Sequence, residues 1–166
     1  MKSRIIETER GKWEIIGLSD TLADESTAAG FDSMTNIARS ARERAYAPYS
    51  KFYVGAAVRM GGTTFSGANV ENASYGATMC AERSAMYKGV GEGHRQIDLI
   101  AVSTGAGPGT PIESRSPCGL CRQVIGEFAL PGALVLLDAG RTRDHEFNGE
   151  VILFDDLLPW KFRLKE

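Results

Sequence analysis

The sequence is poor in the features that mark several specialised classes of protein. Its longest apolar stretches, such as 133–137, fall far short of the roughly 18 residues that a transmembrane helix needs. Charge of one sign is not in excess, since 19 basic and 21 acidic residues give a net charge of -2. The composition therefore gives no indication of nucleic acid or an anionic membrane as a partner. Residues 1–12 contain no apolar signal core, so we expect a cytoplasmic protein.

Cysteine and histidine are also scarce, and the few that occur limit the possible chemistry. The three cysteines, Cys80, Cys118 and Cys121, are an odd number that cannot be paired fully into disulfides. In a reducing compartment such cysteines serve as core residues, metal ligands or nucleophiles. His94 and His145 stand in polar stretches without the spacing of metal ligands. A zinc site built here would have three protein ligands and one position open for water.

The length and composition are those of one folded domain. A chain of 166 residues, 43% hydrophobic and 24% charged, is long enough for one hydrophobic core and short for two. The first thirty or so residues differ in character from the rest. We therefore expect an N-terminal extension at 1–31 and a main folded domain at 32–166.

Apolar periodicity predicts strands that alternate with helices. We expect a small hairpin from residues 4–6 and 13–16, and strands at 52–60, 63–68, 97–103, 133–137 and 151–154. Helices are expected from Asp32, as N-cap, to before Pro48, from about Cys80 to the glycines at 89–93, and from 118 to 128, with a short terminal helical turn. This alternation predicts an α/β domain with helices on both faces of one sheet.

All three cysteines lie at the expected starts of helices, where a thiol loses its proton more easily. Cys118 and Cys121 are two residues apart at the start of an expected helix, and Cys80 opens another. Helix N-termini favour the thiolate, which is the form that a metal needs. Glu82 follows Cys80 by two residues, in the position of a general acid/base beside an activated water. The plainer interpretation is two buried thiols and a solvated glutamate. The pattern also resembles the signature of zinc deaminases, with cysteine as first ligand, and this resemblance favours a zinc site with an acid/base glutamate.

Five segments in order resemble one family, the small homotetrameric zinc-dependent cytidine deaminases with three cysteine ligands. The likeness runs from about Met34 to Phe162. The segments are PYSKFYVGAAV at 48–58, NVENASYG at 69–76, CAER at 80–83, PCGLCRQ at 117–123 and LLPWKF at 157–162.

The resemblance implies a fold and a reaction. The fold is a three-layer α/β/α arrangement around a mixed five-stranded sheet. The reaction is hydrolysis of cytidine and deoxycytidine to the uridines with release of ammonia, a step of pyrimidine salvage. One zinc ion per subunit would be held by Cys80, Cys118 and Cys121, and Glu82 would serve as both base and acid.

The resemblance also implies substrate-binding positions. Phe52 would pack against the pyrimidine, Asn69 and Glu71 would bond the ribose hydroxyls, and Ala81 would offer its main chain to the base. A neutral polyhydroxylated ligand needs such a combination of one apolar face and a few fixed polar groups. Taken from the residues alone, Phe52 also fits a core aromatic, and Asn69 and Glu71 also fit a polar turn.

Three further positions depend on charge and assembly. Tyr75 would reach into a neighbouring subunit's site and Phe162 would close a pocket from another chain, so both roles require the homotetramer. Arg83 would offset the net negative charge of zinc with three thiolates. Arg122 is a second candidate for that task, and an exposed helix arginine is the plainer interpretation of Arg83.

Three alternatives remain at this level. The same chemistry fits a deaminase of a cytosine-containing antibiotic such as blasticidin S, or of a related aminopyrimidine. A non-catalytic zinc scaffold is the alternative of another class, against which Glu82 and the missing fourth ligand both count. A polynucleotide editor is disfavoured, because no basic stripe or run of stacking aromatics is present.

Overall fold

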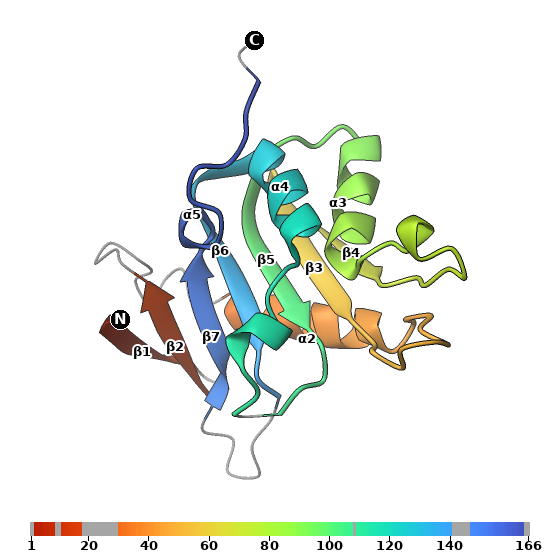
Figure 1. Ribbon diagram of the computed structural model, residues 1–166. Helices are drawn as coiled ribbons and strands as arrows, with labels where there is room; N and C mark the ends of the chain where they lie inside the picture. Colours follow the sequence, from red (N-terminus) through yellow and green to blue (C-terminus); the bar gives the residue numbers. More distant parts are fainter. Residues whose placement is uncertain (1, 9–10, 18–29, 108, 141–146, 165–166) are drawn as a thin grey trace.

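In the part of the chain that the structure describes, the fold is built on one mixed sheet of seven strands (Figure 1). The computed structural model describes residues 2–8, 11–17, 30–107, 109–140 and 147–164. The sheet order is β1-β2-β7-β6-β5-β3-β4, with strands β1 Lys2–Thr8, β2 Gly11–Gly17, β3 Gly55–Met60, β4 Thr63–Ala68, β5 Ile97–Ser103, β6 Ala129–Asp138 and β7 Phe147–Leu153. The helices are α2 Phe31–Arg42, α3 Ala81–Gly91, α4 Gly119–Phe128 and α5 Phe154–Leu157, with short 3₁₀ turns η1 Tyr75–Ala77 and η2 Ile112–Ser114.

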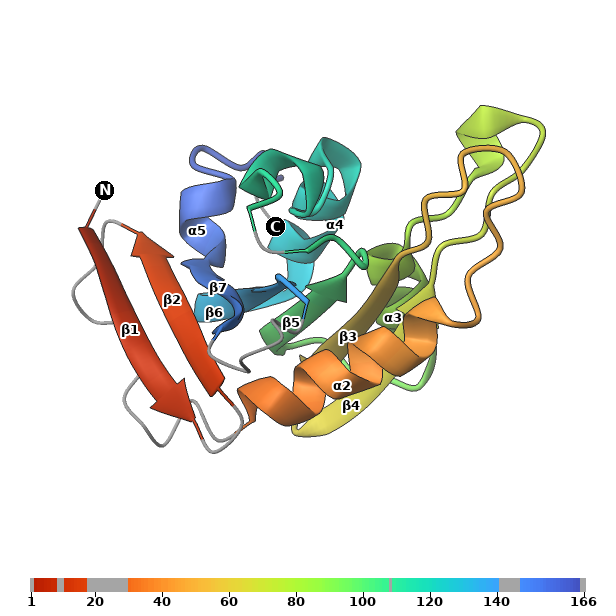
Figure 2. The ribbon, with the colours of Figure 1, turned by 90° about the horizontal axis from the view of Figure 1, so that it is seen from below.

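Helices cover both faces of the sheet, which makes the three layers (Figure 2). Helix α2 lies on one face, where Phe31, Met34 and Ala38 join one buried apolar cluster. Helices α3, α4 and α5 lie on the other face, where Met86 and Ile125 join the second cluster. Strands β5 and β6 are parallel at the centre of the sheet. No helix among the described residues is long and apolar enough to cross a membrane.

The expected architecture is confirmed, and two details of it are wrong. The sheet has seven strands rather than five, because the N-terminal hairpin joins it through the parallel pairing of β2 with β7. Helix α2 takes Gly30 as its N-cap, two residues before the expected Asp32, and ends at Arg42 well before Pro48. Local sequence identified the hairpin, but its docking partner lies more than a hundred residues away along the chain.

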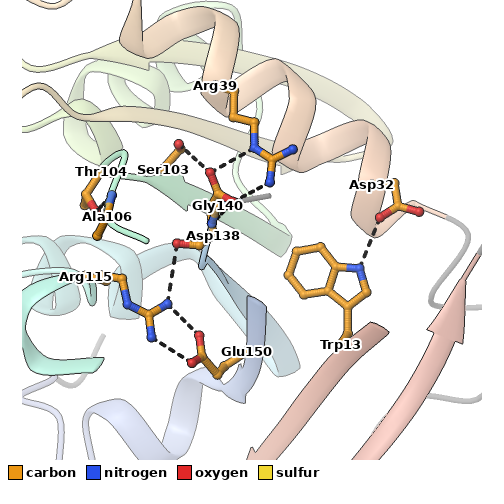
Figure 3. Close-up of polar contacts among 10 residues, drawn as sticks. All are labelled: Trp13, Asp32, Arg39, Ser103, Thr104, Ala106, Arg115, Asp138, Gly140 and Glu150. Carbon is orange, nitrogen blue, oxygen red and sulfur yellow. Dashed lines mark hydrogen bonds and ion pairs between the residues drawn. The ribbon is translucent and has the colours of Figure 1, made fainter. Parts of the chain in front are cut away.

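The hairpin is anchored by Trp13. Its side chain is completely buried and lies edge-on to the ring of Phe31, with ring centroids 5.7 Å apart. The indole N–H donates a hydrogen bond of 3.1 Å to the carboxylate of Asp32 at the start of α2 (Figure 3). The hairpin is thus packed into the hydrophobic core beside α2.

We expect Trp13→Ala to lower the free energy of unfolding by about 3–5 kcal/mol, because it leaves a large cavity in that core. Urea unfolding followed by circular dichroism measures the change. Lys12→Ala is the matched control, since Lys12 pairs with Glu7 at 3.7 Å on the surface and such pairs contribute little. A Trp13→Ala loss no larger than the Lys12→Ala loss would show that the hairpin is not part of the core.

A glycine allows the helix that carries Glu82 to approach the sheet. A Cβ at Gly67 in β4 would lie 2.4 Å from the Ala85 nitrogen and 2.7 Å from the Ala81 carbonyl oxygen, both in α3. Real Cβ atoms do not come that close to main-chain atoms. Gly67 therefore lets the first turns of α3 rest directly on the sheet, and this sets the depth of the site described next.

Candidate active site

The three cysteines come together from two helix N-termini. Cys80 is the N-cap of α3, Cys118 is the N-cap of α4, and Cys121 lies in the first turn of α4. All three Sγ atoms lie within 4.8 Å of one another, and all three thiols are free of disulfides. The positive ends of both helices therefore act on the same small volume.

The electrostatics of this cluster favour a thiolate. The pKa of Cys80 falls to about 5, because the Cys121 thiol donates to its sulfur and the Arg83 guanidinium lies 3.5 Å from it. The pKa of Cys121 is raised, because its proton is held in the bond to Cys80 and its side chain is buried. The same contact with Cys80 raises the pKa of Arg83, which stays charged.

These donors fit a zinc ion. Sulfur ligands at about 2.3 Å in a tetrahedral site lie about 3.8 Å from each other, and the Sγ atoms of Cys80 and Cys118 are 3.9 Å apart. The part of the chain that the structure describes contributes no other group of three metal-ligating side chains this close together. Cys80, Cys118 and Cys121 would hold the ion, and three protein ligands would leave one position for water.

Glu82 is buried beside the sulfurs. Its side chain is 5% exposed although glutamate is normally a surface residue. Burial raises the pKa of Glu82 to about 7, and the negative charge of Cys80 adds to the effect. A carboxyl that gains and loses a proton near neutral pH is suited to proton transfer in both directions.

A cavity of about 220 Å³ opens over this centre. Of the residues expected at the site, it is lined by Phe52, Asn69, Glu71, Cys80, Ala81, Glu82 and Cys118. Phe52 is half exposed at its rim rather than part of the core. The cavity thus combines an aromatic face, polar groups and the sulfur cluster, which is the composition of a small-molecule site.

Asn69 and Glu71 are both buried and both brace the cavity wall. The Asn69 side chain accepts from the Val54 N–H at 2.8 Å and donates to the Phe52 carbonyl at 2.8 Å. The Glu71 carboxylate accepts from the N–H groups of Tyr49 and Ser50 and from the Ser50 hydroxyl. The pKa of Glu71 is lowered, chiefly by that hydroxyl. Each side chain retains hydrogen-bonding capacity for a ligand.

Other expected site residues lie outside the cavity of a single chain. Tyr75 in η1 is 65% exposed, with its ring 6.4 Å from that of Tyr49. Phe162 is 68% exposed, and its carbonyl accepts from the Gln123 side chain at 3.0 Å. Arg122 bonds the Pro117 and Leu157 carbonyls, which ties α4 to its neighbours.

The structure adds residues that the motifs did not include. Thr104, Ser114, Arg115 and Ser116 line the cavity from the segment before Cys118. The sequence signal for these residues is weak, because a segment rich in Gly, Pro and Ser predicts a loop but does not predict which of its side chains face a cavity. The sequence shows that these four side chains are polar, but it does not show that they line the cavity.

Comparisons with known proteins show which family and fold the chain is similar to. The family model of the cytidine and deoxycytidylate deaminase zinc-binding region matches residues 31–137. A cytidine deaminase of Halalkalibacterium halodurans is 42% identical over 129 residues, which make up 76% of this chain and 89% of that protein. The crystal structure of cytidine deaminase from Burkholderia pseudomallei matches with a TM-score of 0.65 at 40% identity, over 79% of this chain and 98% of that one. Cytidine deaminase from Mycobacterium tuberculosis matches with a TM-score of 0.62 at 32% identity, over 80% of this chain and 97% of that one.

The fold and the cysteine centre define a zinc-binding hydrolytic enzyme of the α/β class. More specifically, the chain belongs to the cytidine and deoxycytidylate deaminase family. The family resemblance and the zinc cofactor expected from the sequence are thereby confirmed.

Proposed function

We propose that this protein hydrolyses cytidine and deoxycytidine to uridine and deoxyuridine and releases ammonia. The observation that carries the proposal is Glu82, a buried carboxyl with its pKa raised to about 7, placed beside three clustered cysteine sulfurs at one cavity. The cytidine deaminases that the chain resembles support the choice of substrate. A non-catalytic zinc scaffold gives no reason to bury a glutamate there.

The chain's own residues supply binding and proton transfer. Cys80, Cys118 and Cys121 are the proposed ligands of a zinc ion, which when bound would acidify and orient the attacking water. Glu82 takes the proton of that water as its oxygen bonds to C4 of the pyrimidine, and passes it to N3. The restored carboxylate then takes the remaining proton from the C4 hydroxyl and gives it to the amine as the C4–N bond breaks, so that ammonia leaves, a C4 carbonyl forms and the carboxylate is restored again. Arg83, in contact with Cys80, offsets the negative charge of the thiolates.

The nucleoside is held by the cavity wall in this proposal. Phe52 packs against the base, the Ala81 main chain bonds the base, and Asn69 and Glu71 bond the ribose hydroxyls. Support comes from their position on one cavity and from the burial of Asn69 and Glu71. Because the Phe52 loop is braced by Asn69, the aromatic face is set in place before substrate arrives.

We further propose a homotetramer in the cytoplasm, with 32–166 as the catalytic domain and 1–31 as an N-terminal extension whose strands β1 and β2 join its sheet. The exposed rings of Tyr75 and Phe162 support the tetramer, since each would be covered by another subunit and complete its site. Three free cysteines support a reducing compartment. The family match beginning at residue 31 supports the domain limit.

Turnover of cytidine by the purified, zinc-replete protein tests the function, followed as the loss of cytidine absorbance. The expected result is conversion of cytidine to uridine with release of one ammonia per uridine formed. A folded, zinc-loaded protein that leaves cytidine and deoxycytidine unchanged would overturn the proposal. Screening cytosine-containing antibiotics and other aminopyrimidines would then be the next step.

We expect Glu71→Gln to raise the KM for cytidine roughly tenfold with a smaller change in kcat, because a charged acceptor for ribose hydroxyls is lost. The lowered pKa of Glu71 keeps its carboxylate ionised at pH 5 to 7 in the unaltered protein. The difference in KM between the variant and the unaltered protein therefore persists across that range and becomes smaller only at more acid pH. Steady-state kinetics at several pH values measure it. Glu43→Gln, an exposed residue after α2, is the control, and an equal KM in both variants would rule out this role of Glu71.

A further inference from the structure

Two buried carboxylates and two arginines form a polar network at one end of the central strands (Figure 3). Arg115 makes two hydrogen bonds to the Glu150 carboxylate of β7, at 2.6 and 2.7 Å. Arg39 of α2 makes a second paired contact, with Asp138 at the end of β6. The Ser103 hydroxyl at the end of β5 also donates to Asp138, at 2.6 Å. The network therefore joins α2, β5, β6 and β7.

Arg115 and Glu150 form the unusual part of this network. Arg115 is 3% exposed and Glu150 is 8% exposed. Buried ion pairs of this kind add little to stability compared with apolar residues of the same size. Their geometry is demanding, however, because a planar guanidinium on a carboxylate fixes direction as well as distance. Because this buried pair adds little stability, we infer that its role is to fix the positions of the segments that carry Arg115 and Glu150.

The Arg115–Glu150 pair holds a segment that forms part of the cavity wall. Arg115 lies between Ser114 and Ser116, and all three residues line the cavity. Its guanidinium also donates to the carbonyl oxygen of Thr110 at 3.1 Å and faces that of Asp138 at 3.4 Å. One side chain thus ties its own loop to the end of β6 and to the middle of β7. The loop at 110–116 is held against the sheet by Arg115, which lies three residues before Cys118.

We propose that Arg115, held by Glu150, is a positioning residue that sets the loop wall of the nucleoside cavity and so controls substrate affinity. The inference rests on the proposed function for the identity of the substrate. Cys80 and Glu82 lie at the start of α3, and Cys121 lies in the first turn of α4, so all three stand outside the loop that the pair holds. Disturbing the pair therefore acts on binding more than on the chemical step.

The test must separate positioning from folding. Arg115→Met alone leaves Glu150 buried without a partner, which destabilises a protein whatever its role. The double variant Arg115→Met/Glu150→Leu removes both charges and keeps apolar packing, so it is expected to fold. We expect it to raise the KM for cytidine about tenfold or more, with a smaller change in kcat and one zinc per chain. Arg115→Lys, which keeps the charge but not the paired geometry, is expected to lie between it and the unaltered protein.

The matched control is Arg59→Met/Asp98→Leu. This pair also joins an arginine to a carboxylate, at 2.9 Å, but it connects β3 with β5 and does not line the cavity. Its KM is expected to stay within about twofold of the unaltered protein. An unchanged KM in Arg115→Met/Glu150→Leu would overturn the inference, and so would loss of its zinc, because the pair would then serve the metal ligand rather than the substrate.

A readout without substrate keeps this inference distinct from the proposed function. Hydrogen exchange of the amides at 110–118 is expected to be faster in Arg115→Met/Glu150→Leu than in the unaltered protein and the Arg59 control. Equal exchange in all three would overturn the positioning role even if cytidine is turned over. Failure of the unaltered protein to deaminate cytidine would instead overturn the proposed function and leave the exchange result standing.

Discussion

Glu82→Gln lowers the turnover of cytidine by about three orders of magnitude while zinc stays bound. The expectation follows from the loss of one group that transfers protons twice in each cycle, and general acid/base groups contribute roughly 10²–10⁴-fold each. Glutamine has nearly the same shape as glutamate and fills the same buried site, so the cavity is preserved. The amide, however, cannot take up and return a proton. The measurement is kcat together with the zinc content of the same sample.

Glu127→Gln is the control for this substitution, because Glu127 is exposed near the end of α4. Its turnover is expected to equal that of the unaltered protein. Glu82→Gln with unaltered turnover would exclude Glu82 as the proton-transfer group and remove the main support for a catalytic site. If the zinc were lost as well, Glu82 would be assigned to metal retention instead, and the proton-transfer role would fail on that ground.

Cys118→Ser is expected to abolish zinc binding and activity together while the fold persists. Removal of a residue that hydrogen-bonds to a metal ligand commonly lowers metal affinity or activity 10–100-fold. Removal of a ligand itself is therefore expected to lower zinc affinity by at least about two orders of magnitude. Cys118 is exposed at the start of α4 and is not part of the buried apolar clusters, which are built from the sheet and helices. Zinc content, kcat and far-UV circular dichroism measure the three quantities on one sample.

The same measurements on chelator-treated protein distinguish an enzyme from a zinc scaffold. The enzyme is expected to lose activity with its metal, keep its circular dichroism spectrum and recover activity when zinc is restored. A scaffold held together by the metal would unfold as the zinc leaves. Unfolding of either sample, or unimpaired activity of Cys118→Ser, would contradict the assignment of the cysteines to a catalytic zinc.

Local patterns were sufficient for much of the fold. The strands 63–68 and 97–103 follow directly from short-range signals, and the structure has them at those residues. The Cys-Ala-Glu and Cys-x-x-Cys motifs place their cysteines at helix starts, which is also a local property. Each of these features is decided by residues within a few positions of one another.

Long-range packing decided the rest. The number of strands depended on whether the hairpin of Trp13 would dock on β7, and no nearby residue specifies that contact. The pKa of Glu82 near 7 depends on its burial, which the residues around it in sequence do not reveal. The pairing of Arg115 with Glu150 spans thirty-five positions and was invisible as a motif. The sequence alone thus determined which groups are available for chemistry, and tertiary structure decided which of them share a cavity, because burial and charge pairing arise only when distant segments are brought into contact.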